Sequence, residues 1–249
     1  MAGRGTKAPS GRSDRKNQLV LIVDDNEAEL LRITALLEKF SYQTLKAASD
    51  KEAFANATAR VPSLAVISLD LPGMEDLKLM WQLRNHPATA HIPVIGIAGK
   101  DDKDLKGRCL DHGAAGFLSR PFEAEALYKA VQAALEKNPR SGIRVSTVLP
   151  VKVHGGAHDA LYGAYALTLS SGGMFLRTMS PVAVHSGISL EFNLNGRTIA
   201  AETTVLYNCQ NGCGPEMETG IGLGFVDISR KDREVVSEFI RGEVMKDVV

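Results

Sequence analysis

Two arginines lie four residues apart near the middle of the chain, within residues 137–145. Arg140 and Arg144 flank Gly142, and Pro139 precedes them, so a simple helix cannot continue through this stretch. A guanidinium group is always charged and donates planar, paired hydrogen bonds that fit a phosphate group. The spacing predicts an anion-binding site at a joint between two differently patterned halves of the chain.

The half before this joint alternates apolar runs with amphipathic segments, and Asp24 and Asp25 follow the first run. Continuous apolar runs are typical of buried parallel strands, whose carboxyl ends carry the sites of such sheets. The pattern predicts an α/β doubly wound fold with a five-stranded parallel sheet. The expected strands are Leu19–Val23, Tyr42–Ala48, Leu64–Leu69, Ile92–Ala98 and Gly116–Ser119, with helices between Leu30 and Phe40, from Ser49, and over Glu75–Arg84, Asp101–His112 and Glu123–Glu136.

The half after the joint reads as about six short strands separated by tight turns such as Asn195-Gly196, which predicts an antiparallel β-barrel or sandwich. Ser229, with Asp232 three residues later, marks the start of a C-terminal helix. The expected strands are Val145–Val153, Ala164–Leu169, Met174–Arg177, Ile188–Leu194, Thr198–Tyr207 and Ile221–Val226.

Composition sets the broad class of the protein. The 249 residues are 44% hydrophobic with zero formal net charge, which is typical of a globular chain with two cores. No run approaches the roughly eighteen apolar residues that span a bilayer. The odd number of cysteines (Cys109, Cys209 and Cys213) argues against a disulfide framework, so we expect a cytoplasmic protein.

The expected domains are a disordered basic tail at 1–18, an α/β domain at 19–137 and a barrel at 138–249. The tail is rich in Gly, Ser, Lys and Arg, a composition that does not build a core. No nucleophile triad, phosphate-binding loop or pair of catalytic carboxylates stands out, so we expect no enzymatic activity.

Four motifs of the first half follow one another in a fixed order. They are Val23-Asp-Asp-Asn, the stretch from Val66 to Met74, Pro93-Val-Ile, and the stretch from Gly113 to Phe122. Together they resemble the receiver (CheY-like) domain of two-component response regulators. In that family an acidic pair holds Mg²⁺, an Asp ending the third strand becomes the acyl phosphate, a Thr or Ser ends the fourth strand, and a Lys precedes Pro-Phe.

Three positions depart from this family pattern. Ser68 stands at the phosphoacceptor position, and its hydroxyl is not ionised at neutral pH and cannot form the mixed anhydride of an aspartyl phosphate. Ala98 has no hydroxyl to contact a phosphoryl group, and Arg120 keeps the positive charge without the compact ammonium geometry. These changes predict a pseudo-receiver with a degenerate phosphorylation site, retained for docking or dimerisation.

Two acidic features leave a remnant of the phosphoryl chemistry open. Asp24 and Asp25 could hold a divalent cation, but without a third carboxylate Mg²⁺ binding should be weak and is doubtful. Asp70 could act as a substitute acceptor, because it points to the same side as Ser68 if the strand persists. Two residues move it roughly 6.5 Å along the strand, and the spacing from Ser68 to Pro72 fits the family turn without a shift. We therefore favour the pseudo-receiver.

The second half carries three further motifs: an Arg-x-x-x-Arg from Arg140 to Arg144, the stretch from Thr168 to Phe175, and the stretch from Thr219 to Phe225. They resemble the PilZ domain, whose members bind the bacterial second messenger cyclic di-GMP. The resemblance implies that Arg140 and Arg144 bind the phosphates and guanine edges of this ligand. Guanine presents the acceptors O6 and N7, which an arginine fork matches with two hydrogen bonds.

The second of these motifs is written Asp/Asn-x-Ser-x-x-Gly in the family and reads Thr168, Ser170 and Gly173 here. Ser170 offers a hydroxyl, and Gly173 permits close approach of the backbone. Thr168 lacks the charge or the carbonyl of the family residue, and loss of a charge-assisted hydrogen bond costs about 1.5 to 3 kcal/mol. Cyclic di-GMP binding at micromolar strength and loss of binding both stay open.

The sequence thus predicts a bacterial signalling adaptor that senses cyclic di-GMP and whose partners are unidentified signalling or motility proteins. A homodimer through the receiver domain is one expected arrangement. Bound ligand would order the joint and change which partner surface is exposed. Two alternatives stay open: a ligand-independent protein–protein interaction module with a degenerate PilZ domain, favoured by Thr168, and a phosphorelay receiver that uses Asp70.

Overall fold

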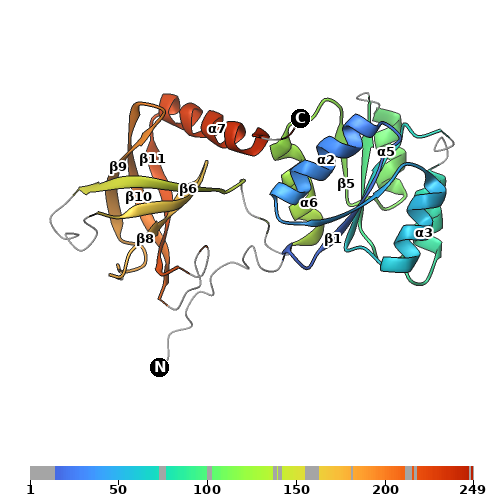
Figure 1. Cartoon of the computed structure of the whole chain (residues 1–249), viewed down its shortest axis with the longest axis horizontal. Helices are drawn as coiled ribbons and strands as arrows, with labels where there is room; N and C mark the ends of the chain where they lie inside the picture. Colours follow the sequence, from blue (N-terminus) through green and yellow to red (C-terminus); the bar gives the residue numbers. More distant parts are fainter. Residues whose placement is uncertain are drawn as a thin grey trace. The chain divides into compact units, whose positions relative to one another are not determined.

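The computed structural model describes residues 15–72, 77–99, 103–136, 139, 142–154, 163–180, 182–210, 215, 218–246 and 248. The chain divides into two compact units at the step from residue 141 to residue 142. The predicted fold class is confirmed, since a five-stranded parallel α/β sheet precedes a closed six-stranded antiparallel barrel with a C-terminal helix (Figure 1). None of the helices in the described ranges is long and apolar enough to cross a membrane.

The first unit is a parallel sheet in the order β2-β1-β3-β4-β5. Helices α3, α4 and α5 cover one face of this sheet, because their buried side chains share a core with alternate residues of β1 and β3. The strands are β1 (Leu19–Val23), β2 (Gln43–Ala47), β3 (Leu64–Ser68), β4 (Val94–Ala98) and β5 (Gly116–Ser119), and the helices are α2 (Glu27–Lys39), α3 (Asp50–Arg60), α4 (Lys78–Asn85), α5 (Lys103–Asp111) and α6 (Ala124–Leu135).

Local sequence explains where these helices begin. The Asn26 side chain accepts a hydrogen bond from the backbone N–H of Glu29 and so caps α2 at the residue after Asp25. The Ser49 hydroxyl accepts from the Glu52 N–H, while the Glu52 carboxylate accepts from the Ala48 N–H. Because α2 is capped so close to the end of β1, its first turn lies at the carboxyl edge of the sheet.

The segment before β1 is packed against the first unit. Arg15 is only 6% exposed, and its Nε lies 3.1 Å from Glu136 Oε1 at the end of α6. Its guanidinium also lies over the rings of Tyr42 and Tyr128. The predicted disordered tail of residues 1–18 is therefore wrong for Arg15 to Gln18, which belong to the domain, and its first fourteen residues lie outside the described ranges.

The second unit is an antiparallel barrel closed in the order β10-β11-β8-β7-β6-β9. Side chains alternate along its strands, so that Val145 and Leu169 are buried whereas their neighbours Ser146 and Thr168 face outward. The strands are β6 (Val145–His154), β7 (Tyr165–Ser170), β8 (Gly173–Arg177), β9 (Gly187–Leu194), β10 (Arg197–Cys209) and β11 (Gly220–Ile228).

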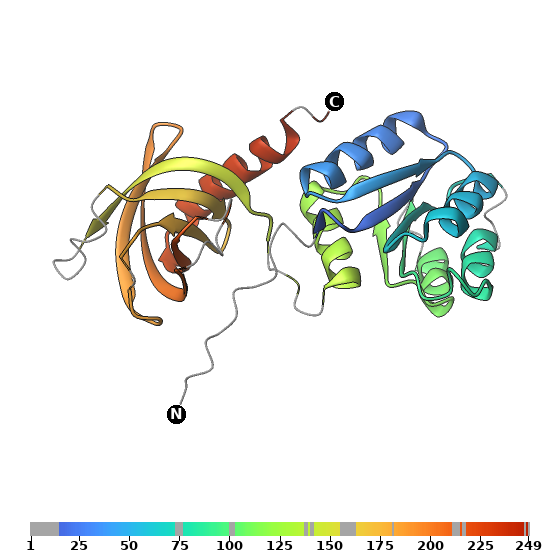
Figure 2. The same ribbon diagram turned by 60° about the horizontal axis from the view of Figure 1, so that its bottom comes forward.

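Helix α7 (Arg230–Met245) packs against β6, β7 and β9, and Figure 2 shows it in red lying along the barrel. Ser229 caps this helix as predicted, since its hydroxyl accepts from the Asp232 N–H at 3.1 Å. The predicted turn at Asn195-Gly196 joins β9 to β10, with both residues at positive φ as a tight hairpin requires.

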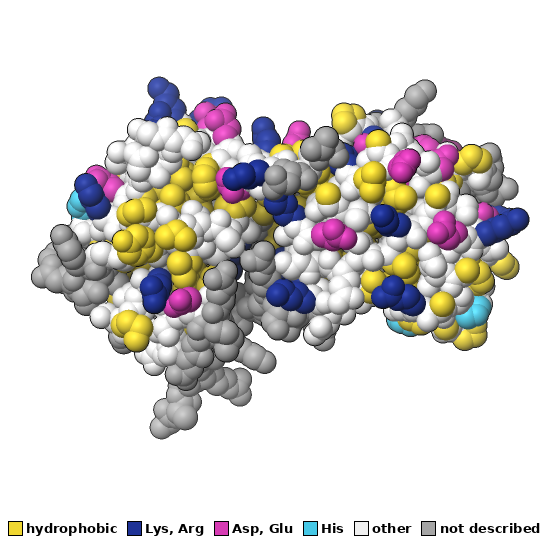
Figure 3. Space-filling model, viewed as in Figure 1, with side chains coloured by type: hydrophobic (Ala, Val, Ile, Leu, Met, Phe, Trp, Pro, Cys, Tyr) yellow, Lys and Arg dark blue, Asp and Glu magenta, His cyan; other side chains and the backbone are white. Residues whose placement is uncertain are grey.

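The surface of the barrel unit exposes several large apolar side chains, and Figure 3 shows apolar groups gathered on the visible face of this unit. Among the described residues of this unit, the exposed large apolar side chains are Val148, Tyr165, Met179, Val184, Leu206, Val226 and Met245. Cysteine pairing also differs from the expectation. The odd cysteine count argued against a disulfide framework, yet Cys209 is disulfide-bonded, whereas Cys109 is free and buried.

Candidate functional site

The carboxyl edge of the parallel sheet brings together the positions predicted for a degenerate phosphorylation site. Asp24 directly follows β1, Ser68 ends β3 and Ala98 ends β4. All three are almost fully buried, with exposed fractions of 1–2%. Arg120 follows β5, and its backbone N–H donates to the Ala98 carbonyl at 2.7 Å. Parallel strands account for this gathering, because their carboxyl ends meet at one edge.

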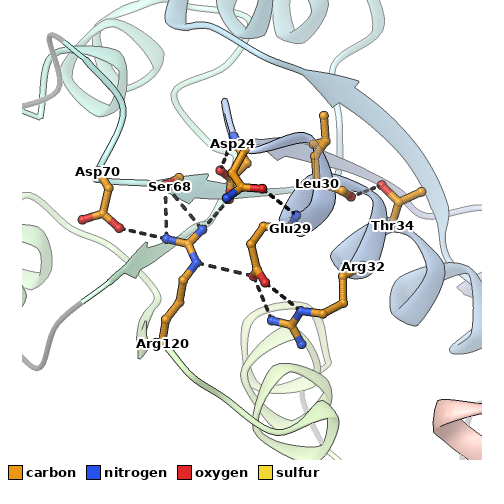
Figure 4. Close-up of polar contacts among 9 residues, drawn as sticks. Asp24, Glu29, Leu30, Arg32, Thr34, Ser68, Asp70 and Arg120 are labelled. Carbon is orange, nitrogen blue, oxygen red and sulfur yellow. Dashed lines mark hydrogen bonds and ion pairs between the residues drawn. The ribbon is translucent and has the colours of Figure 1, made fainter. Parts of the chain in front are cut away.

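Arg120 spreads its guanidinium across this edge, as Figure 4 shows. Its Nη1 lies 2.9 Å from Asp70 Oδ2, and its Nη2 donates to Asp24 Oδ2. Both Nη atoms lie 3.4 Å from the Ser68 hydroxyl, and Nε faces Glu29 Oε2 at 3.5 Å. The side chain is only 17% exposed. One arginine therefore contacts three carboxylates from three different segments.

Glu29 and Arg32 of α2 extend this network, and sequence reasoning missed both. Arg32 donates to the two Glu29 oxygens at 3.1 and 3.0 Å. Its guanidinium also lies over the Phe122 ring, 4.6 Å from the centroid. The available signal was the position of Glu29 in the first turn of a helix that starts two residues after Asp25. The network thus ties α2 to the segment that follows β5.

Charge and burial shift the pKa values of these carboxylates in opposite directions. Burial raises the pKa of Asp24, although the Asn26 hydrogen bond and the Arg120 charge oppose that shift. The hydrogen bond from Arg32 lowers the pKa of Glu29, and the charges of Arg32 and Arg120 lower it further. The guanidinium groups are the counter-ions that let these carboxylates stay charged at the sheet edge.

The arrangement does not match the oxygen cage of a divalent cation. Asp24 uses Oδ1 to accept from the Asn26 N–H at 3.0 Å and Oδ2 to accept from Arg120. Asp25, the other predicted ligand, is exposed to solvent. Across the described residues, no group of three or more His, Cys, Asp or Glu side chains is placed to hold a metal ion. Mg²⁺ binds several oxygens around one point, and here each Asp24 oxygen already accepts a hydrogen bond.

Asp70, the predicted substitute acceptor, lies two residues beyond the end of β3. Its side chain is 47% exposed and is held by Arg120. Gly99 lies beneath it, so close that a Cβ at that glycine would come within 3.1 Å of Asp70 Oδ2. Strand β3 ends at Ser68, so the extended geometry assumed for Asp70 does not persist to that residue.

The second candidate site lies where β6 begins beside the end of β7. Val145 opposes Leu169 and Ser146 opposes Thr168 in the antiparallel register. Arg144 comes directly before β6, and strand alternation puts it on the outer face together with Ser146. It is exposed and has no salt bridge or side-chain hydrogen bond within the described part of the chain.

The turn from β7 to β8 is held by the two predicted residues at its ends. The Ser170 hydroxyl donates to the Gly173 carbonyl at 3.0 Å, which leaves its lone pairs as acceptors. A Cβ at Gly173 would lie 2.0 Å from the Leu223 carbonyl oxygen, so β11 already makes the close approach that requires glycine here. A Cβ at Gly142 would lie 2.9 Å from Ser171 Oγ, which brings the stretch before Arg144 against this turn.

Thr168 completes the outer face of this region. It is half-buried and opposes Phe175 of β8, whose ring is buried. Arg140, the other predicted phosphate ligand, lies outside the described residues. The structure thus brings Arg144, directly before β6, close to Thr168 and Ser170 of β7 and Gly173 of β8.

Comparison with known families agrees with these two units. The model of the response regulator receiver domain matches residues 20–132, and the model of the PilZ domain matches residues 136–242. Protein PilH of Pseudomonas aeruginosa is 34% identical over 116 residues, which make up 47% of this chain and 96% of PilH. The response regulator PleD of Caulobacter vibrioides is 30% identical over 113 residues, which make up 45% of this chain but only 25% of PleD.

Solved structures with a similar fold include two response regulators. The chemotaxis response regulator CheY4 of Vibrio cholerae has 24% identity and a TM-score of 0.45, with 47% of this chain and 98% of that chain covered. A putative response regulator from Chloroflexus aurantiacus has 28% identity and a TM-score of 0.46, with 48% and 98% covered. With the family models and PilH, the chain belongs to the response regulator receiver family and joins its receiver domain to a PilZ domain.

Proposed function

We propose that this protein is a cytoplasmic, non-enzymatic signalling adaptor that binds cyclic di-GMP through its PilZ domain. The receiver and PilZ matches support this class, because both are signalling domains. The observation that carries the proposal is the exposed Arg144 beside the β7–β8 turn, where no described residue neutralises it. The Arg144 guanidinium is permanently charged and can donate paired hydrogen bonds to an external anion.

The chemistry of cyclic di-GMP suits this surface. Arg144 would bind a phosphate or the O6/N7 edge of a guanine, with Arg140 as the second fork of the motif. Ser170 keeps acceptor lone pairs for a guanine N–H, because its proton is donated to Gly173. Thr168 supplies a hydroxyl acceptor without charge, so we expect affinity in the micromolar range rather than complete loss.

Calorimetric titration of cyclic di-GMP into the full chain tests the proposal, at protein concentrations that resolve tens of micromolar. We expect wild type to bind and Arg144→Ala to bind at least about tenfold more weakly, because a charge-assisted contact is lost. Arg177→Ala is the matched control. Arg177 lies on the same barrel face at the far end of β8, where it pairs with Glu218. Unchanged binding by Arg144→Ala would contradict the proposed site.

For the receiver domain we propose a docking role without a phosphoryl switch. Ser68 occupies the acceptor position as a buried hydroxyl near Arg120, and Asp70 is engaged in an ion pair with the same arginine. Incubation with an acyl-phosphate donor should leave wild type unlabelled. Labelling that disappears in Asp70→Asn would instead establish the phosphorelay alternative.

A ligand-independent interaction module is the second candidate function, and Thr168 is the observation that favours it. The family residue at this position accepts hydrogen bonds with a charge or a carbonyl, and threonine has neither. Absence of measurable heat for wild type and for both arginine variants would support this module and turn the search toward partner proteins.

A further inference from the structure

The guanidinium of Arg120 lies among three carboxylates of the receiver domain. Asp24 comes from the end of β1, Asp70 from the turn after β3 and Glu29 from the first turn of α2, and each contacts a different nitrogen of Arg120. Figure 4 shows the three carboxylates around one guanidinium. The position holds a permanent positive charge that belongs to the protein itself.

We propose that Arg120 acts as a built-in cation at this sheet edge. It takes the place that a divalent ion would need and holds the segment after β5 against the ends of β1 and β3 and the first turn of α2. Asp24 illustrates the exclusion, because its Oδ2 is bound by Arg120 and its Oδ1 by the Asn26 N–H. A divalent cation could reach this carboxylate only by displacing a guanidinium that cannot lose its charge.

The shape of the arginine side chain explains how one residue contacts all three carboxylates. A planar guanidinium presents five N–H donors in fixed directions. Here Nη1 and Nη2 donate to Asp70 and Asp24, and Nε lies 3.5 Å from Glu29 Oε2 as an ion pair. A lysine ammonium is a single point of charge at the end of a flexible chain and would serve fewer of them at once. The Arg120 side chain therefore joins three segments where lysine would join fewer.

Arg32 adds further contacts between α2 and the segment after β5. Arg32 binds both oxygens of Glu29 and lies over Phe122, two residues after Arg120. The segment after β5 is thus held to α2 by a charge pair and by a cation–π contact. Such a network favours one arrangement of the sheet edge, and a ligand could shift it only by binding another arrangement more tightly.

Manganese binding to the full chain tests this inference, with Mn²⁺ followed by electron paramagnetic resonance and by the thermal midpoint. We expect wild type to show no bound Mn²⁺ up to about 1 mM, whereas Arg120→Gln should bind it at least about tenfold more tightly and gain a few degrees in midpoint. Arg32→Gln is the matched control, because it removes a neighbouring guanidinium that does not contact Asp24. It should behave as wild type does.

Binding by Arg120→Gln should vanish when Asp24→Asn is added, which assigns the metal to this pocket. If Arg120→Gln is unfolded without metal, Mn²⁺ should restore its folded signal, since a cation replaces the missing charge. Mn²⁺ binding by wild type that depends on Asp24 would overturn the proposal. Failure of Arg120→Gln to bind or to be restored would overturn it too, because the carboxylates would then not form a cation site at all. The test uses no nucleotide, so its failure leaves the cyclic di-GMP proposal intact.

Discussion

Arg120 in the receiver domain and Arg144 in the barrel carry the same guanidinium in opposite surroundings. Arg120 is 17% exposed and contacts three carboxylates of its own domain. Arg144 is exposed, with no ion pair within the described ranges, and it stands beside hydroxyl groups rather than acids. The two arginines thus differ in whether their own domain supplies the counter-ions, and only Arg144 presents to an external anion a positive charge that no described residue matches.

The largest effect is expected where the internal charge pair is broken. Arg120→Ala should lower the free energy of unfolding of the receiver domain by about 3–5 kcal/mol, because it leaves the buried Asp24 carboxylate without its counter-ion. Trp81, the single tryptophan, lies in α4 and reports on this domain in urea titrations followed by fluorescence. Arg144→Ala removes an exposed charge of the barrel, so it should change the free energy of unfolding of the barrel little, as followed by far-UV circular dichroism in the same urea titrations. An equal decrease in the free energy of unfolding for the two variants would contradict the difference between the two arginines.

The next prediction concerns how the stability of the receiver domain depends on pH. Burial raises the pKa of the Cys109 thiol to about 11 and that of the Tyr42 phenol to about 12, both in the receiver domain. The unfolded chain then ionises first, so the stability from these groups is complete below about pH 9 and is lost as the pH rises toward 11–12.

Two pKa units for Cys109 correspond to roughly 3 kcal/mol. Urea titrations followed by tryptophan fluorescence should therefore give a much lower free energy of unfolding at pH 11 than at pH 8. The decrease should be smaller in Cys109→Ala. Identical pH dependence in the two proteins would show that the buried thiol does not control this transition.

A smaller effect is expected for substitutions of Thr168 in the barrel, measured as changes in cyclic di-GMP affinity. Thr168→Asn restores a carbonyl acceptor next to Ser146 and Phe175, and Thr168→Val keeps the shape without a hydroxyl. We expect Thr168→Asn to bind cyclic di-GMP about tenfold more tightly and Thr168→Val to bind more weakly than wild type, as measured by calorimetry. No difference among the three would mean that this position does not face the ligand.

The smallest effect concerns an ion pair at the surface of the barrel unit. The hydrogen bond from Ser229 lowers the pKa of Asp232, and the Arg197 side chain lowers it further. Its stabilising effect is present above the ordinary carboxyl pKa and is lost as the pH falls through the lowered value. Asp232→Asn should flatten the acid limb of the barrel stability profile slightly. An unchanged limb would place the acid sensitivity elsewhere.

Sequence patterns predicted the elements and the edge of the sheet but not the contacts between them. The buried run of β1 and the turn at Asn195-Gly196 are local signals, and both held. The pairing of Arg120 with Glu29 depends on how α2 lies against the end of β5, and the burial of Arg15 depends on Tyr42 and Tyr128 packing together around it. Long-range contacts of this kind leave no periodic signature.

Side-chain NMR of the arginine Nε–H groups tests the central contrast most directly, with signals assigned through Arg120→Lys and Arg144→Lys. We expect the Arg120 signal to be protected from solvent exchange and to stay unshifted when cyclic di-GMP is added. The Arg144 signal should exchange rapidly in the free protein and become slow and shifted in the complex. A ligand-induced shift at Arg120, or an Arg144 signal that saturating ligand leaves unchanged, would contradict this contrast.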